Sequence, residues 1–154
     1  MRFVADAMLG RLAKWLRFLG YDVLYHPDIC DAELIRIARA QDRCILTRDT
    51  RLAQRKGIPR CLLIFSNDPP GQLREVKKSS LLTGADPVGR CVACNGSLVA
   101  VGSKQEIRNR VPEHIFLSRT VFHRCNDCDR IYWQGTHQVR FRSQLKEMLQ
   151  EDGD

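Results

Sequence analysis

The sequence predicts a three-layer α/β/α domain with a parallel sheet, followed by a small zinc ribbon with four cysteines. Two observations predict this fold. Short apolar runs alternate with amphipathic segments over residues 1–79, and a β-α alternation of this kind gives a parallel sheet with helices on both faces. Two C-x-x-C pairs then follow in the second half of the chain, where they predict a separate metal-binding module.

Four short apolar runs in the first half of the chain are expected to form the strands, over 2–5, 22–25, 44–46 and 61–65. Runs of this length fit the buried strands of a parallel sheet. Helices are expected over 7–19, from 31 up to the third strand, and over 50–56 and 72–79. Gly20 suits the position that ends the first helix, and Gly10 within that helix suggests a close backbone approach.

The stretch from Asp31 to Asp49, DAELIRIARAQDRCILTRD, combines one of these helices with the strand after it. The helix has a buried face because its apolar residues recur at three-to-four spacing: Leu34, Ile35, Ile37 and Ala38. A crossover helix runs antiparallel to its strands, so its N-terminus lies at the sheet edge where the strands end. Asp31 and Asp49 are therefore both predicted at the edge where open α/β sheets bind ligands.

Further aspartates are expected at the same edge, since Asp6, Asp28 and Asp68 follow the first, second and fourth strands. Each of these residues alone has an ordinary structural interpretation as a helix cap. Several neighbouring carboxylates, however, repel one another and either raise a pKa or recruit a cation. In a basic protein, such a cluster indicates Mg²⁺ or Mn²⁺ acting on a phosphodiester, where the ion polarises the phosphoryl group and activates water.

The charge of the chain favours a polyanionic partner. The formal net charge is +7, and it is concentrated in residues 1–85, which hold 15 basic and 9 acidic side chains. Such an excess gives a salt-dependent attraction to nucleic acid, although a merely soluble basic surface is an alternative interpretation. No apolar run reaches the roughly 18 residues that span a bilayer. Charged residues interrupt the N-terminal apolar segment, so a cytoplasmic location without a signal peptide is expected.

Four of the seven cysteines have the spacing of a zinc site. Two pairs, Cys91 with Cys94 and Cys125 with Cys128, are separated by 30 residues, and each pair places two thiolates on one tight turn. Redox dithiols or disulfides are the alternatives, but zinc is favoured in a chain with no secretory signal. A site with four cysteines is coordinatively closed, so its zinc is expected to be structural.

Other residues of the second half have two interpretations each. Tyr132 and Trp133 offer stacking surfaces for unpaired bases, but core packing is favoured for at least one of them. Basic residues are expected on or near strands between the two cysteine pairs, where they either guide RNA or form a solvated face: Lys104, Arg108, Arg110, Arg119 and Arg124. An amphipathic helix is expected after residue 140, with a polar end at 151–154.

These motifs together resemble a known family. The segments FVADAMLGRLAKWLRFLGYDVLYHPD and DAELIRIARAQDRCILTRD, with a four-cysteine module ending in YWQGTH, are similar to the Mut-seven C-terminal RNase family. The resemblance extends through about His137 and implies a PIN-like domain fused to a zinc ribbon. The expected divisions are a PIN-like nuclease domain over 1–83, the ribbon over 88–140, and a C-terminal helix and tail over 141–154.

The resemblance also implies a catalytic site. PIN-like nucleases hold Mg²⁺ or Mn²⁺ on acids that correspond here to Asp6, Asp31 and Asp49, and leave a 5′-phosphate and a 3′-hydroxyl. The residue that completes the site stays open among Glu33, Asp28 and Asp68. Three cations flank the acidic edge and are candidates to contact RNA phosphates, with solvated charge as the alternative: Arg11, Lys14 and Arg48.

The function that we expect is that of a metal-dependent ribonuclease whose zinc ribbon aids RNA binding. One alternative is a non-catalytic module that binds RNA or a ribonucleoprotein and has kept the fold. Another is an adaptor in which the ribbon docks on a protein partner, and such binding would be insensitive to salt, unlike phosphate contacts.

Overall fold

The computed structural model of the chain describes residues 1–150; the polar end predicted at 151–154 lies outside the described residues. Four strands form the predicted parallel sheet, in the spatial order β2-β1-β3-β4. They are β1 (Phe3–Ala5), β2 (Val23–Tyr25), β3 (Cys44–Thr47) and β4 (Cys61–Leu63). The chain leaves β1 towards one side to form β2, and crosses back to place β3 on the other side of β1.

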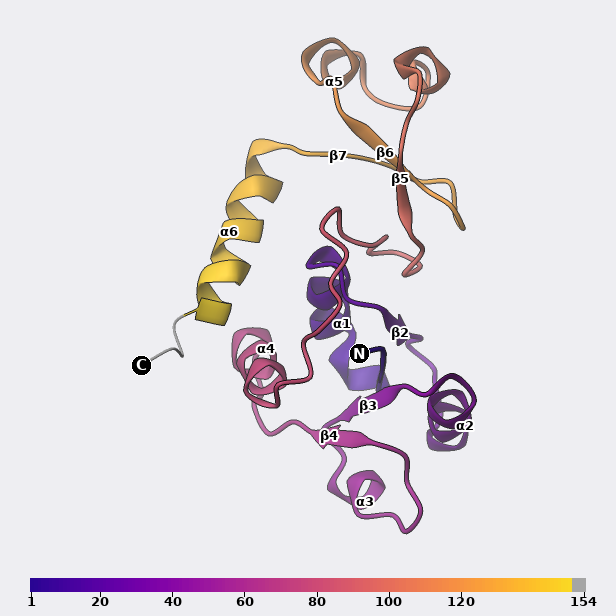
Figure 1. Cartoon of the computed structure of the whole chain (residues 1–154), viewed down its shortest axis with the longest axis vertical. Helices are drawn as coiled ribbons and strands as arrows, with labels where there is room; N and C mark the ends of the chain where they lie inside the picture. The colour runs from indigo at the N-terminus through magenta and orange to yellow at the C-terminus, as the bar shows by residue number, and fades with distance from the viewer. Residues whose placement is uncertain (151–154) are drawn as a thin grey trace.

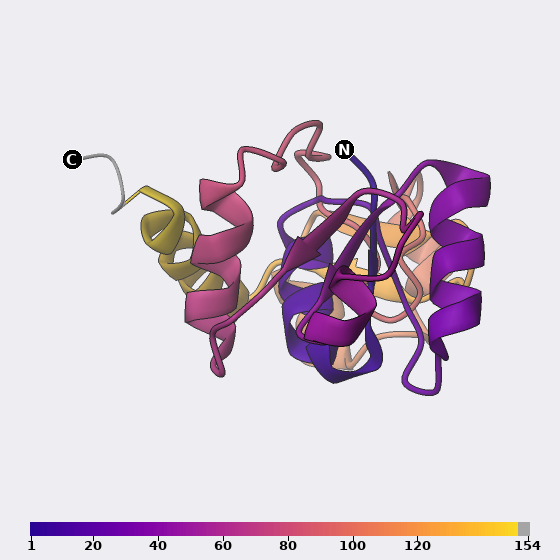
Figure 2. The same cartoon turned by 90° about the horizontal axis from the view of Figure 1, so that it is seen from below.

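Helices cover both faces of this sheet, which confirms the predicted three layers (Figure 2). Helix α1 (Gly10–Phe18), preceded by the short 3-10 helix η1 (Ala7–Leu9), packs on one face with α4 (Pro69–Lys78). Helices α2 (Asp31–Gln41) and α3 (Thr50–Ala53) pack on the other. Side chains of β1 and β3 alternate between the faces, in the register Phe3 with Cys44, Val4 with Ile45 and Ala5 with Leu46.

Several helix boundaries differ from the sequence prediction. Helix α4 begins at Pro69 rather than at residue 72, because the Asp68 carboxylate accepts from the Gly71 N–H and proline fits the first helical turn. Helix α3 ends at Ala53, short of the predicted residue 56. Gly10 has the close approach that its place in a helix suggested, since an added Cβ would lie 2.6 Å from the Tyr25 hydroxyl.

A second sheet of three antiparallel strands forms the ribbon, which we define as residues 90–133. Its strands are β5 (Leu98–Ala100), β6 (Phe122–Cys125) and β7 (Ile131–Trp133). The segment between β5 and β6 contains the helical turns η2 (Lys104–Ile107) and α5 (Glu113–Ser118). Several basic residues that were expected on or near strands therefore lie in this helical insertion.

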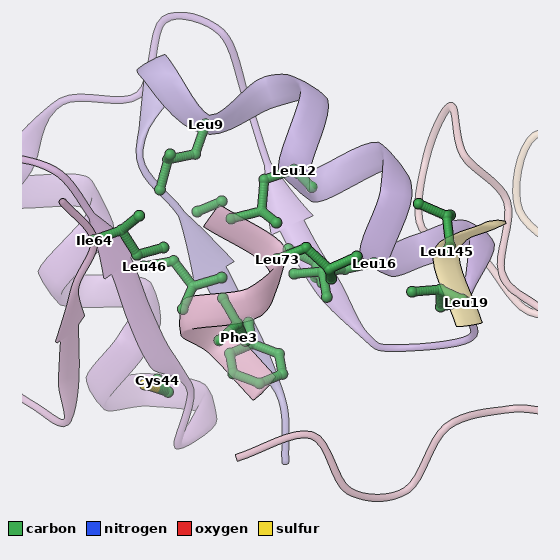
Figure 3. Close-up of a cluster of buried hydrophobic side chains, with 14 residues drawn as sticks. Phe3, Leu9, Leu12, Leu16, Leu19, Cys44, Leu46, Ile64, Leu73 and Leu145 are labelled. Carbon is green, nitrogen blue, oxygen red and sulfur yellow. The ribbon is translucent and has the colours of Figure 1, made fainter. Parts of the chain in front are cut away.

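The chain then returns from the ribbon to the first sheet. Helix α6 (Thr136–Gln150) runs back beside α4, as Figure 1 shows. Its Leu145 side chain is fully buried in the same core as Phe3, Leu12 and Leu16 (Figure 3). Cys44 belongs to this core too, and its burial raises the pKa of the thiol to about 11. Within residues 1–150, no helix combines the length and apolar character that crossing a bilayer requires.

Candidate functional site

The four predicted cysteines meet in space between the two turns that carry them. The Sγ atoms of Cys91 and Cys128 lie 3.6 Å apart, those of Cys94 and Cys125 lie 3.4 Å apart, and all four lie within 4.8 Å of one another. A tetrahedral zinc site with Zn–S bonds of 2.3 Å separates its sulfurs by roughly 3.8 Å. The arrangement therefore fits a tetrahedral S₄ ion such as zinc.

Each cysteine turn is followed by a residue in the left-handed conformation. Asn95 follows the first pair with φ 72°, and Asp129 follows the second with φ 64°. The sequence pattern also indicates Gly96, two residues after Cys94, as the residue that eases the first turn, but Asn95 supplies the positive φ. Gly96 is needed for a different reason, since a Cβ there would lie 2.6 Å from the Cys125 sulfur.

The thiols of the cluster differ in pKa. Burial raises the pKa of Cys94 to about 12. Burial acts in the same direction on Cys91, but hydrogen bonds with the Tyr132 hydroxyl and with backbone N–H groups outweigh it and lower the pKa to about 7. Four adjacent thiolates repel one another, whereas a divalent cation at their centre deprotonates coordinating thiols.

The first cysteine turn is docked on the α/β layers by buried polar groups. The Arg17 guanidinium, 3% exposed, donates to the carbonyls of Val23 (2.9 Å) and Val92 (3.0 Å). Asn95 accepts from the Val23 N–H at 2.9 Å and donates to Asp22 at 2.7 Å. Because Val23 is the first residue of β2, the ribbon is attached at the amino end of the parallel sheet.

The candidate acidic site lies at the opposite edge, after the ends of β1 and β3. The Thr47 hydroxyl is fully buried there; it donates to Asp6 Oδ2 at 2.6 Å and accepts from the Asp49 N–H at 3.0 Å. Asp6 Oδ1 also accepts from the Ala7 N–H, and Asp49 Oδ1 caps α3 through the Arg51 and Leu52 N–H groups. Thr47 therefore holds the Asp6 carboxylate and the Asp49 backbone together.

Asp31 has a different setting from the other two predicted acids. It is the first residue of α2, and its carboxylate forms an ion pair with Arg55 at 3.7 Å. Its side chain is 43% exposed, so this pair is weak in water. Among residues 1–150, the four cysteines are the one group of three or more potential ligands close enough together for a metal ion.

The three cations predicted to contact RNA differ in exposure and in hydrogen bonding. Arg11 and Lys14 are exposed on α1. Arg48 is half-buried and its Nη2 donates to the Asn67 side chain, while its buried Nε has no hydrogen-bond partner in the described chain. Trp15 of α1 packs edge-on against Phe141, with ring centroids 5.6 Å apart.

One candidate residue at the acidic edge was not found from the sequence. Phe65 follows β4 and is 72% exposed. Its loop is rigidly held, because the Glu75 carboxylate accepts from the N–H groups of Phe65 (2.9 Å) and Ser66 (2.7 Å) and from the Ser66 hydroxyl. Burial opposes ionisation of Glu75, but these hydrogen bonds prevail and lower its pKa. The signal available in the sequence was an aromatic residue at the end of the strand predicted over 61–65, which the structure ends at Leu63.

The sequence profile of a family described as the Mut7-C RNAse domain matches residues 1–145. This chain belongs to that family. Comparison with curated proteins and with solved structures gave no match. The Mut7-C assignment confirms the resemblance drawn from the sequence, and its description indicates a nuclease function with RNA as the substrate. The four-cysteine site is the part of this Mut7-C chain whose geometry fits a metal.

Proposed function

We propose that this protein is a metal-dependent ribonuclease, with Asp6, Asp31 and Asp49 as the catalytic acids and a structural zinc ion in the ribbon. The observation that carries the proposal is the link of Asp6 to Asp49 through Thr47 at the carboxyl edge of the sheet. This edge, beside the point where the chain reverses its direction across the sheet, is where α/β proteins place their ligand sites.

The chemistry of the three acids fits Mg²⁺ or Mn²⁺, which prefer carboxylate oxygens. Asp49 Oδ2 has no hydrogen-bond partner among the described residues, and the long pair with Arg55 leaves Asp31 available to a cation. A divalent ion held by these residues would stabilise charge on the phosphoryl oxygens and lower the pKa of the attacking water. Thr47 would fix Asp6 in place, because its hydroxyl donates to one of the Asp6 oxygens.

RNA would approach this edge over a cationic and aromatic surface. Arg11 and Lys14 on α1 and Arg48 after β3 would contact phosphates. Phe65 lies at the same edge of the sheet, two residues after Leu63, which pairs with Thr47 at the end of β3. An exposed ring on a rigid loop would stack on a base next to the scissile bond.

A second candidate function is favoured by a specific observation. Asp6 and Asp49 both cap helical turns, and Asp31 is paired with Arg55, so each acid already has a structural role. A non-catalytic module that binds RNA or a ribonucleoprotein would keep these residues for folding alone. Replacing them would then leave RNA affinity intact and remove no cleavage.

The test separates the charge of the acids from their capping role. Asn at position 49 keeps a cap oxygen and the shape of the side chain, so Asp49→Asn removes the charge with little effect on α3. Asp86→Asn is the matched control. Asp86 lies in the linker, which we define as residues 79–89 between α4 and the ribbon, and its carboxylate accepts a hydrogen bond from the Val88 N–H. Cleavage of end-labelled single-stranded and structured RNA is measured with Mn²⁺ for both variants and the wild type.

We expect wild type and Asp86→Asn to cleave RNA only when Mn²⁺ or Mg²⁺ is present, and Asp49→Asn to lose this cleavage. If wild type binds RNA and cuts none of the substrates, the enzyme proposal fails and the binding module is the better account. Equal cleavage by Asp49→Asn and wild type would show that the catalytic site lies elsewhere in the protein.

A further inference from the structure

A pocket of about 240 Å³ lies where the ribbon meets the linker, the end of α1 and the start of α6. Aromatic residues from three different elements line it: Phe18 of α1, His123 of β6, and Tyr132 and Trp133 of β7. Two arginines, Arg90 and Arg142, stand at its wall, and no aspartate or glutamate does among the described residues. Ligand pockets for drug-sized molecules are larger, about 300–1,000 Å³. The size therefore suits one planar ring system.

The rings of the pocket are held in place. His123 and Tyr132 are direct partners in the antiparallel ladder, so both side chains project from the same face of the ribbon. The Tyr132 hydroxyl lies 2.9 Å from the Cys91 sulfur, which ties this wall to the cysteine cluster. On the opposite wall, the Phe18 ring packs against Phe141 with centroids 5.5 Å apart. A rigid aromatic cleft of this kind binds flat ligands without first having to become ordered.

The cations give the pocket its polarity. The Arg142 guanidinium lies over the Phe18 ring, 4.5 Å from its centroid, and burial lowers its pKa. Within the described chain, no hydrogen bond or ion pair satisfies its donors. Arg90 is anchored instead, because its Nε donates to the Asn95 carbonyl at 2.9 Å. The side-chain amide of Gln138 also lines the pocket, and amides supply both donors and acceptors to the edge of a base.

Helix α1 connects the acidic edge to this pocket. Arg11, Lys14 and Phe18 are spaced at i, i+3 and i+7 along α1, which places them on one face of the helix. Helix α1 begins just after Asp6 and ends at the pocket, a distance of roughly 14 Å for nine residues at 1.5 Å each. An RNA strand whose phosphates contact Arg11 and Lys14 would therefore reach the rings of the pocket.

We propose that this pocket binds one unpaired nucleobase of the RNA, stacked between the aromatic rings, with Arg142 directed at its phosphate or carbonyl groups. The inference rests on the proposed function, since it adds a base-binding subsite to the same RNA. It assigns the ribbon a direct role in recognition through the face that carries His123 and Tyr132. A nucleotide satisfies both features of the pocket, because its base stacks on the rings and its phosphate or carbonyl groups accept from the guanidinium.

The first test fills the pocket without changing the charge. Val88 lines the pocket and is 38% exposed, so Val88→Trp places a large ring in the space that the base would occupy. Val139→Trp is the matched control, because Val139 is 51% exposed on α6 and lies outside this pocket. Equilibrium binding of single-stranded RNA is measured with the zinc-loaded full chain, without Mg²⁺ or Mn²⁺ so that cleavage does not interfere.

We expect Val88→Trp to weaken RNA binding roughly five- to 150-fold, the range that corresponds to stacking one base, and Val139→Trp to change it less than twofold. An RNA with one base replaced by an abasic site should show the same loss with wild type, and no further loss with Val88→Trp. Equal affinities for both tryptophan variants, or an abasic loss that is the same in wild type and Val88→Trp, would overturn the proposal.

A second pair of variants covers the case in which Val88→Trp does not fold. Arg142→Gln removes the guanidinium at the wall, and Arg140→Gln removes the same charge two residues away on α6, outside the pocket. Arg142→Gln should weaken binding by a larger factor and abolish the abasic effect. Equal losses for the two variants would show attraction by net charge alone and would contradict a base-binding pocket.

The outcomes for the pocket and for the nuclease are distinguishable. If Asp49→Asn abolishes cleavage while Val88→Trp and Arg142→Gln bind RNA like wild type, the ribonuclease stands and the pocket proposal falls. A free mononucleotide offers the same base and phosphate as RNA. Calorimetry with AMP, GMP, CMP and UMP tests whether the pocket binds a free mononucleotide. A mononucleotide that binds wild type but not Val88→Trp, in a chain that binds no RNA, would support a base-binding pocket and reject the ribonuclease. Binding of neither RNA nor mononucleotides overturns both proposals.

Discussion

The Thr47 hydroxyl donates a hydrogen bond of 2.6 Å to the carboxylate of Asp6, and both side chains are buried at the end of adjacent strands. The same hydroxyl accepts from the Asp49 N–H, so one oxygen fixes the relative positions of two candidate catalytic residues. From the sequence, the place of Thr47 two residues before Asp49 allows two interpretations: it orients the Asp49 carboxylate or a metal-bound water, or it is an ordinary strand residue. In the structure it contacts the Asp6 carboxylate and only the backbone of Asp49.

Replacing Thr47 with valine should therefore affect both stability and metal binding. Val keeps the shape but leaves a buried Asp6 oxygen without its donor, at a cost of about 1–3 kcal/mol in the free energy of unfolding. Urea denaturation measures that loss, and the Mn²⁺ dependence of RNA cleavage should shift to higher concentration. Thr47→Ser restores the hydroxyl and should recover both properties. A Val variant with unchanged Mn²⁺ dependence would restrict Thr47 to a structural role.

Removal of one zinc ligand should remove the metal and loosen the ribbon. The purified chain is expected to contain one zinc per molecule, and Cys128→Ser to contain almost none. The ribbon has a small core of its own, built on Ile107, Val111, Phe116 and Phe122, so it depends on the metal for its fold. Elemental analysis and chelator titration measure zinc content. The control is Cys30→Ser, since Cys30 is exposed and outside the cluster; zinc loss in both variants would contradict the assignment.

Much of the first sheet could be predicted because local signals and tertiary structure agree there. The runs ending at Ala5 and Thr47 are apolar, their alternate side chains are buried on both faces, and an acid follows each. The position of Asp6 and Asp49 at the carboxyl edge of the sheet then follows from general rules for β-α units. The partner of Asp31 did not follow, because its pairing with Arg55 depends on how α3 is placed after β3.

The helical insertion in the ribbon was missed for a physical reason. Helices η2 and α5 have four and six residues, well below the roughly 12–15 that a helix needs to be stable alone. They exist because Ile107 and Phe116 pack on Phe122 of β6, a contact between distant parts of the sequence. The base-binding pocket was missed in the same way. Phe18 and Tyr132 are 114 positions apart and are brought together by the docking of the ribbon.

Acid should weaken the contact between the ribbon and the α/β layers through Asp22. Burial raises the pKa of this carboxyl, but hydrogen bonds from Arg43 and Asn95 outweigh burial and lower it below its ordinary value. A group whose pKa is lowered on folding stabilises the fold above its unfolded pKa of about 3.9, and loses that contribution as the pH falls through the folded value. Stability should therefore decline below about pH 4.

Asp22→Asn tests this contribution. The variant should lose about 1–3 kcal/mol at pH 7, since Arg43 is 7% exposed and would keep its charge without a full partner. The difference in unfolding free energy between wild type and variant should shrink as the pH drops below about 4. Asp28→Asn provides the control, because Asp28 is exposed. A difference that stays constant from pH 7 to pH 3 would show that ionised Asp22 contributes nothing specific.

Phe65 offers a test of RNA contact at the acidic edge that is independent of the acids themselves. Its ring is 72% exposed, so Phe65→Ala should leave the unfolding free energy almost unchanged. RNA binding should weaken by about 1–3 kcal/mol if a base stacks on the ring, and Phe65→Trp should preserve it. Leu117→Ala is the matched control, because Leu117 is equally exposed at 73% but lies on α5 of the ribbon.

The kinetics of the same variants locate the contact. Stacking that exists already in the bound substrate should raise KM and leave kcat near the wild-type value, since it contributes equally to the ground state and the transition state. A lower kcat at saturating RNA would instead mean that Phe65 aligns the scissile phosphate against Asp49. If Phe65→Ala changes neither quantity while it abolishes self-association or capture of a protein, the exposed ring belongs to a protein interface, and RNA reaches the edge without it.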